Sequence, residues 1–287
     1  MDETDKIYER LAEVEYFIKW RTENLGFGMW NSQNFGEGYE FEKISEYSMH
    51  DEPKHINWRA TAKSGGQTVY KNEFSLEKNI SMYLVADRSD SMRFGTSESK
   101  RMLSAEVAAI LSYSALRFND EVGLITWPDA HILRPRSSSN FYHVIVESLL
   151  EKRGPETKPL SSALDLLPKK RSLVVLISDF LNVENLYQTL NDHADRHDFI
   201  AVVVEDRMEI ELPPVFCFLN LRDLETGESQ KAALTKHTIE AFRQSAARQR
   251  EELFGIFDAL GIHSLRVSAD LLPQDFVTFF LEKRLWM

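Results

Sequence analysis

From residue 80 onward, short runs of consecutive apolar residues alternate with longer segments of helical periodicity. Consecutive apolar residues indicate strands that are covered on both faces, as in a mostly parallel sheet. The runs predict strands at 80–86, 123–127, 173–177, 199–204, 215–219 and 265–267. The segments between and after them predict helices at 99–118, 139–151, 160–167, 183–195, 237–260 and 273–283. This alternation predicts an α/β domain with a doubly wound, mostly parallel, Rossmann-like sheet and right-handed crossovers.

The first 77 residues follow a different pattern and predict a smaller N-terminal part. Residues 3–22 carry apolar residues every three or four positions, which predicts an amphipathic helix that either docks on the protein's own core or meets a partner helix. Residues 24–38 are rich in Gly, Asn and Phe and indicate irregular structure, and short β elements are predicted within 39–75. We therefore predict two domains, an N-terminal part at 1–77 and the α/β domain at 78–287.

Charge and apolar content exclude several classes of protein. With 287 residues, 43% of them apolar, the chain can bury about 75% of the surface of its unfolded state, which excludes extensive disorder. The 45 acidic and 34 basic residues are interspersed and give a net charge of −11, which argues against binding to nucleic acid. An acidic N-terminus, a single cysteine (Cys217) and the lack of a long apolar run argue against export and membrane insertion. We expect a cytoplasmic protein.

Oxygen-bearing side chains follow the predicted strands at the place where such folds bind ligands, which is the carboxyl edge of the sheet where the strand order reverses. Asp87, Ser89 and Ser91 alternate along the loop after the first strand. Asp179 follows the third strand, and Thr157 lies in the loop before a short predicted helix. Carboxylate and hydroxyl oxygens suit a small, hard cation such as Mg²⁺. Because Ser, Thr and Asp also favour helix caps and turns, spacing and position alone leave a cation site and a set of capping residues both open.

Further sequence features accompany these five residues. They are Gly38-Tyr-Glu-Phe41, Tyr47 with Asp51-Glu52, Ile56-Asn-Trp-Arg-Ala-Thr-Ala-Lys63, Arg222-Asp-Leu-Glu-Thr-Gly-Glu228 and the long helix at 237–260. The five residues resemble the metal-ion-dependent adhesion site of von Willebrand factor A-like domains. The chain from roughly residue 36 to 284 resembles one bacterial branch of these domains, the domain-of-unknown-function family fifty-eight. It departs from the family pattern in Asn57, which replaces an Asp, and in a loop before Leu160 that is one residue longer.

The resemblance implies a binding site rather than a catalytic one. It implies that Ser89, Ser91 and Thr157 coordinate a cation directly, while Asp87 and Asp179 bind it through waters. The cation would be Mg²⁺, or Mn²⁺ or Ca²⁺, and a carboxylate from a protein partner would fill its open coordination position. The resemblance further implies a metal-dependent interaction module that serves a MoxR-type AAA+ ATPase, or the client of one, in complex assembly or maturation.

A magnesium-dependent hydrolase or phosphatase that acts at the same strand ends is the alternative function. Enzymes with an aspartyl nucleophile usually carry a second Asp two residues later, where this chain has Ser89. The sequence also lacks the G-x-S-x-G motif and the G-x-x-x-x-G-K-[ST] phosphate loop. We therefore expect no enzymatic activity. A third reading is a scaffold that keeps the fold and binds no metal.

Two histidine pairs and one tryptophan need separate interpretation. His193 and His197 have the i, i+4 spacing of a helical zinc pair, but the Glu of zinc proteases is missing, and we interpret them as surface residues at a helix end. His50 and His55 flank acidic residues and indicate a polar turn. We expect Trp58 to pack the N-terminal part onto the main domain, because a large apolar ring is stabilising when it is buried.

Overall fold

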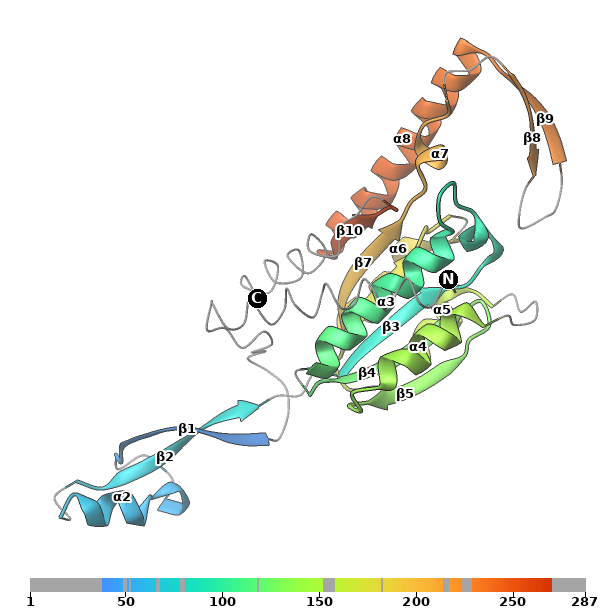
Figure 1. The fold of residues 1–287 in the computed structure, drawn as a ribbon. Coiled ribbons are helices and arrows are strands. Elements are labelled where there is room, and N and C mark those ends of the chain that lie inside the picture. Colours follow the sequence, from blue (N-terminus) through green and yellow to red (C-terminus); the bar gives the residue numbers. More distant parts are fainter. Residues whose placement is uncertain are drawn as a thin grey trace. The chain divides into compact units, whose positions relative to one another are not determined.

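The computed structural model describes residues 38–48, 51, 53–65, 68–77, 81–117, 119–151, 158–181, 183–213, 217–222 and 229–269. These residues belong to two compact units, a small one within 38–77 and a large one within 81–269 (Figure 1). The predicted helices at 3–22 and 273–283 lie outside the described residues, as do Thr157 and His50. No helix in the described part of the chain is both long and apolar enough to cross a membrane.

A six-stranded sheet forms the centre of the large unit, with the strand order β10-β7-β6-β3-β4-β5. The strands are β3 (Ser81–Asp87), β4 (Glu121–Trp127), β5 (Ile132–Arg136), β6 (Leu173–Ser178), β7 (Asp198–Val204) and β10 (His263–Val267). All neighbours run parallel except β5, which is antiparallel to β4. The chain proceeds outward from β3 through β4 to β5, and then outward on the other side from β6 through β7 to β10. The predicted doubly wound, mostly parallel sheet is therefore confirmed, with its order reversing between β3 and β6.

Helices cover both faces of this sheet. The described helices of the large unit are α3 (Lys100–Arg117), α4 (Phe141–Leu150), α5 (Leu160–Leu164), α6 (Leu186–Ala194), α7 (Arg207–Ile210) and α8 (Lys236–Ala259), of which α7 lies beyond the end of β7 (Figure 1). On β3, Met82, Leu84 and Ala86 pack with apolar residues of α3 and α4, the two helices seen in front of the strands in Figure 1. Tyr83 and Val85 alternate with them and pack with residues of α5, α6 and α8. Burial on both faces explains why the sequence of this strand is continuously apolar.

Two elements differ from the sequence-based expectation. The run at 215–219 is not a strand of the central sheet, because β8 (Cys217–Arg222) pairs with β9 (Ser229–Leu234) in a separate antiparallel hairpin. From Leu219 to Arg222 apolar and polar residues alternate, which is typical of a two-stranded ribbon rather than a buried parallel strand. The edge strand β5 was not predicted, since its sequence contains Pro135 and polar residues, which edge strands tolerate.

The small unit is a hairpin of β1 (Gly38–Glu46) and β2 (Tyr70–Glu77), joined through a 3-10 turn (Pro53–His55) and α2 (Trp58–Lys63). Asn57 caps α2 by accepting a hydrogen bond from the Ala60 amide, and its side-chain amide donates to Asn72 Oδ1 at 2.7 Å. The cap therefore ties α2 to β2. Trp58 is 71% exposed, so it has no core position within the small unit, and the expectation that it packs the N-terminal part onto the main domain stays a prediction. Trp58 is the first residue of α2, and Thr61, further along the helix, accepts a hydrogen bond from the Tyr70 amide of β2.

Candidate metal site

Two carboxylates lie at the ends of two neighbouring strands, at the point where the strand order reverses. Asp87 is the last residue of β3, and Asp179 directly follows the last residue of β6, Ser178. The Ser178 hydroxyl donates to Asp87 Oδ2 at 2.5 Å and accepts from the Phe180 amide at 2.8 Å. The end of β6 therefore orients the carboxylate of β3. This edge of an open α/β sheet is where ligands bind.

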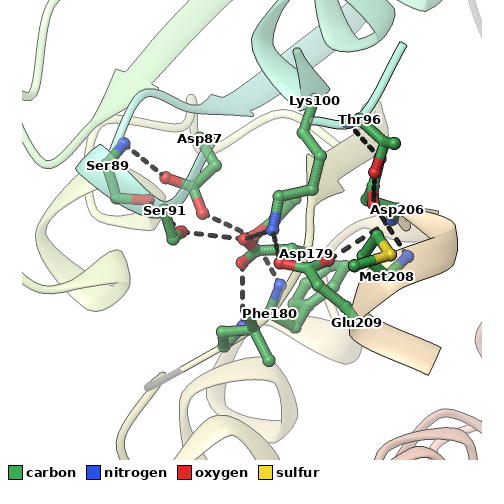
Figure 2. Close-up of polar contacts among 12 residues, drawn as sticks. Asp87, Ser89, Ser91, Thr96, Lys100, Asp179, Phe180, Asp206, Met208 and Glu209 are labelled. Carbon is green, nitrogen blue, oxygen red and sulfur yellow. Dashed lines mark hydrogen bonds and ion pairs between the residues drawn. The ribbon is translucent and has the colours of Figure 1, made fainter. Parts of the chain in front are cut away.

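The loop after β3 brings two hydroxyl groups to the same place (Figure 2). The Ser89 amide donates to Asp87 Oδ1 at 2.8 Å, and the hydroxyl oxygens of Ser89 and Ser91 lie 3.0 Å apart. The Ser91 hydroxyl donates to Asp179 Oδ2 at 2.8 Å. Four of the five predicted site residues thus lie together, and the fifth, Thr157, falls outside the described residues.

The spacing of these oxygen atoms is that of ordinary hydrogen bonds and is also compatible with the ligand spacing of a small octahedral cation. Ligands about 2.0–2.1 Å from Mg²⁺ at adjacent octahedral positions lie about 2.9 Å from one another. The separations of 3.0 Å between the Ser89 and Ser91 hydroxyls and 2.8 Å from Ser91 to Asp179 match this value. Within the described residues no group of three or more His, Cys, Asp or Glu side chains is arranged to hold a metal. The candidate donor set at the sheet edge is a mixed one of two carboxylates and two hydroxyls.

The two carboxylates are buried and repel one another. Asp87 is 3% exposed and Asp179 is 6% exposed. Burial raises the pKa of Asp87 to about 6, and the negative charge of Asp179 adds to this effect. Two buried acids whose charges repel one another stabilise the fold only if a positive charge accompanies them.

Lys100, the first residue of α3, supplies one positive charge and was not predicted from the sequence. Its side chain is completely buried, and Nζ lies 2.6 Å from Asp179 Oδ2 and 2.5 Å from Glu209 Oε1 of α7. Burial raises the pKa of Glu209, and the contact with Lys100 opposes that rise. One signal for Lys100 was present in the sequence, because it continues the apolar stripe of Leu103 and Val107 at helical spacing. A lysine on the core face of a helix requires a buried anion.

A second contact holds α7 beside the site. Asp206 caps α7, accepting from the Met208 amide at 2.9 Å, and it also accepts from the amide and hydroxyl of Thr96 at 2.7 and 2.6 Å. Thr96 lies in the loop that leads into α3. This loop needs Gly95, because a Cβ atom there would come 1.8 Å from the Glu98 carbonyl oxygen. The loop before α3 and the loop after β7 are thereby joined at the same sheet edge.

Arg88 fixes the neighbouring loops. Its guanidinium lies 2.8 Å from Asp129 Oδ2, and both side chains are largely buried. It also donates to the carbonyl of Glu151 at the end of α4. Lys158, seven residues after the Glu151 cap of α4, donates its amide to the Pro128 carbonyl at 3.1 Å. The two described residues that flank 152–157, the segment containing Thr157, are therefore anchored close to β3 and β4.

His193 and His197 differ in position from the sequence-based interpretation, which placed both on the surface at a helix end. Helix α6 ends at Ala194, so His193 and His197 do not share a helix. His197 is only 3% exposed, and its ring packs edge-on against Phe199 of β7. Burial lowers the pKa of His197. His197 is thus a core residue at the start of a strand, whereas the sequence predicted a surface position.

Comparisons with known proteins place the chain in a family. The family model described as "Protein of unknown function DUF58" matches residues 43–252. The uncharacterized protein Rv1480 of Mycobacterium tuberculosis is 25% identical over 290 residues, which cover 97% of this chain and 90% of that protein. The uncharacterized protein MAV169 of Mycobacterium avium is 31% identical over 130 residues, which cover 44% of this chain and 76% of that protein.

Solved structures with a similar fold include the conserved hypothetical protein BatB from Bacteroides thetaiotaomicron, with a TM-score of 0.44 and 16% identity, covering 72% of this chain and 100% of that one. They also include the SpRpn10 VWA domain, with a TM-score of 0.37 and 12% identity, covering 70% of this chain and 94% of that one. The family model spans well over half of the chain, from β1 to α8. The family predicted from the sequence is therefore confirmed, and the chain belongs to the DUF58 family.

Proposed function

We propose that this protein is an interaction module whose sheet-edge site holds a divalent cation and presents it to a carboxylate of a partner protein. The observation that carries the proposal is the pair of buried acids, Asp87 and Asp179, beside two hydroxyls at octahedral ligand spacing. The cation is Mg²⁺, or Mn²⁺ or Ca²⁺, which all prefer oxygen ligands. When bound, it supplies a fixed positive charge that attracts an external carboxylate.

Each residue has a distinct part in this proposal. Ser89 and Ser91 contribute neutral hydroxyl oxygens, and Thr157 is proposed to contribute a third. Asp87 and Asp179 contribute the two negative charges that retain the cation. Ser178 keeps the Asp87 carboxylate oriented toward the serine loop. Because the hydroxyl ligands are neutral, an additional carboxylate from outside the chain is electrostatically favourable.

Apolar side chains beside the site support binding of a protein. Phe94 is 37% exposed and Leu181 is 43% exposed, and both are large hydrophobic residues. Phe94 lies with its ring centre 6.0 Å from Lys100 Nζ, and the Leu181 amide donates to Asp179 Oδ1 at 2.9 Å. A partner segment with a carboxylate between apolar side chains would bury both residues while it completed the cation shell.

The proposed partner is a MoxR-type AAA+ ATPase or its client, in the cytoplasm. This part of the proposal is supported by the family resemblance. The protein would act as an accessory that brings the ATPase and its client together during complex assembly.

Co-purification of the partner tests the proposal. We expect Asp179→Asn and EDTA to reduce recovery of a MoxR-type ATPase, by about tenfold or more for the loss of one charge-assisted contact. Moderate salt should reduce it much less, since a partly buried contact is screened less than a surface one. The control is Asp192→Asn on α6, an exposed residue that contacts Gln188. Equal recovery with native protein, Asp179→Asn and EDTA-treated protein would contradict the proposal.

The alternative of a hydrolase or phosphatase is tested separately. Native protein and Asp87→Asn are assayed with a generic phosphate monoester and Mg²⁺. We expect no turnover in either. Magnesium-dependent turnover that Asp87→Asn abolishes would favour the enzyme and contradict a purely binding role.

A further inference from the structure

Lys100 places a positive charge where the proposed cation is to act. Its ammonium group lies 2.6 Å from Asp179 Oδ2, the same oxygen atom that accepts the hydrogen bond of Ser91 (Figure 2). The other oxygen, Oδ1, already accepts from the Leu181 amide. The ammonium therefore holds the oxygen of Asp179 that faces the serine loop.

The position of Lys100 is unfavourable without these anions. Its side chain is completely buried, and it begins α3, where the helix dipole disfavours a positive charge. A buried ammonium is tolerated only when anions compensate the lost hydration. Among the described residues, Lys100 Nζ contacts two such anions, Asp179 Oδ2 at 2.6 Å and Glu209 Oε1 at 2.5 Å. Lys100 is thus a built-in counter-cation for the acidic site.

We propose that Lys100 competes with the divalent cation for Asp179, so that it sets how tightly the site binds metal. This inference rests on the proposed function, since it assumes that the site binds metal at all. A cation that shares Oδ2 of Asp179 meets the nearby positive charge of Lys100 and is repelled by it. The metal can bind only when the ion pair between Lys100 and Asp179 is broken.

Glu209 determines how readily Lys100 gives up Asp179. Glu209 belongs to α7, which Asp206 and Thr96 hold in place through two hydrogen bonds. While Glu209 is charged, the ammonium keeps one anionic partner when the metal takes the other. Removal of the Glu209 charge leaves Asp179 as the only anion of this pair, and Lys100 then competes more strongly. The two residues are expected to affect metal affinity in opposite directions.

Calorimetric titration with Mg²⁺ and Mn²⁺ measures this competition in the full-length protein. For Lys100→Met we expect binding that is tighter by about 10- to 100-fold, which corresponds to one competing charge-assisted hydrogen bond. For Glu209→Gln we expect weaker binding than in the native protein. The control is Arg117→Met, which removes one positive charge from the exposed end of the same helix, about 25 Å from Lys100. Its affinity should equal that of the native protein.

The outcomes separate this inference from the proposed function. Opposite shifts in the two variants support the competition, because a purely structural role would weaken binding in both. If native protein shows no metal binding in the titration and Lys100→Met does bind metal, Lys100 prevents metal binding in the native protein and the inference is supported. If native protein binds and folded Lys100→Met binds equally or more weakly, the inference is wrong and the proposed function stands. If Lys100→Met does not fold, the result for Glu209→Gln decides, with unchanged affinity overturning the inference. If no variant binds either metal, both proposals fail.

Discussion

At the scale of single residues, the folded environment disfavours the charge of Asp87. It is 3% exposed, and it accepts hydrogen bonds from the Ser178 hydroxyl and from the amide and side chain of Ser89. These hydrogen bonds favour the ionised form, but burial and the charge of Asp179 outweigh them and raise its pKa from 3.8 to about 6. Lys100 contacts Asp179 and Glu209, so it does not neutralise Asp87 directly.

The first prediction is that Asp87→Asn stabilises the metal-free protein at neutral pH. The pKa of Asp87 is about 6 when folded and 3.8 when unfolded, so above pH 6 its charge costs about 3 kcal/mol of the free energy of unfolding. Below pH 3.8 the residue is neutral in both states and the cost disappears. Urea unfolding in EDTA should show Asp87→Asn to be more stable than native protein at pH 7.5, with the difference vanishing toward pH 4. A native protein that is more stable at pH 7.5 would contradict this account.

The same residue should govern the pH dependence of metal binding. A protonated Asp87 carries no charge, so the affinity for Mg²⁺ should fall by up to about tenfold for each pH unit below 6, while it stays constant above 7. Titrations between pH 5 and 8 measure this. Asp87→Asn should bind weakly at every pH in that range. A native affinity that does not change between pH 5 and 7 would mean that Asp87 is not among the ligands.

The proximity of four predicted site residues could be inferred from the sequence, because local spacing and strand position determine it. Asp87, Ser89 and Ser91 lie on one loop, and the end of a continuously apolar strand places Asp179 at the same edge. Lys100 and Glu209 were not predictable as a pair, since they are 109 residues apart and meet only when α7 packs beside α3. The buried position of Lys100 was visible as periodicity, but its partner depended on tertiary structure.

At the scale of elements, the short helix α7 depends on its cap. Four residues are too few for a helix to be stable by itself, so contacts from outside must hold it. Asp206 provides them, as it accepts from Met208 inside the helix and from Thr96 outside it. Burial acts to raise the pKa of Asp206, but the hydrogen bonds from Thr96 and Met208 prevail and lower it.

The third prediction concerns this cap. Asp206→Ala should lower the free energy of unfolding at pH 7 by about 2–4 kcal/mol, since a cap contributes about 1 kcal/mol and hydrogen bonds to a charged group contribute more. Thr96→Val, which removes only the hydroxyl, should cost about half of this. Because the pKa of Asp206 is lowered on folding, its contribution exists above the pKa of the unfolded chain and is lost as the pH falls through the folded value. Urea unfolding measures both variants.

The control for the cap is Asp192→Ala, an exposed acid whose side chain contacts Gln188 on the same helix. It should change stability by less than about 0.5 kcal/mol. If Asp206→Ala is equally mild, the link between α7 and the loop before α3 does not contribute to the stability of the fold.

At the scale of the whole molecule, the candidate metal site belongs to one compact unit. The residues that build it lie between Asp87 and Glu209, in the unit described within 81–269. The small unit is a two-stranded hairpin with one short helix, and its Trp58 ring is 71% exposed. A two-stranded sheet has little core of its own, so its stability is expected to be low. Continuous apolar runs in the sequence predicted the large sheet. No comparable pattern in the sequence indicated which residues of the hairpin unit are exposed.

The last prediction is that a divalent cation protects the large unit selectively. A ligand at a hundredfold excess over its Kd stabilises the state that binds it by about 2.7 kcal/mol, so the slowest amides should exchange up to about 100-fold more slowly. Hydrogen exchange with Mg²⁺ and with EDTA should show this protection in β3, β6 and α3 and leave β1 and β2 unchanged. The difference arises because amides of the small unit exchange through local opening, which does not expose the metal site.

Asp87→Asn serves as the matched control, since it keeps the size of the side chain and removes the charge that retains the cation. Its exchange should be the same with Mg²⁺ and EDTA in both units. If native protein shows equal protection of β1 and β6, the two units unfold as one cooperative body, and the hairpin is stabilised through the large unit. If Mg²⁺ protects Asp87→Asn as strongly as native protein, the ion binds elsewhere, and the acids at the sheet edge are neutralised from within the chain.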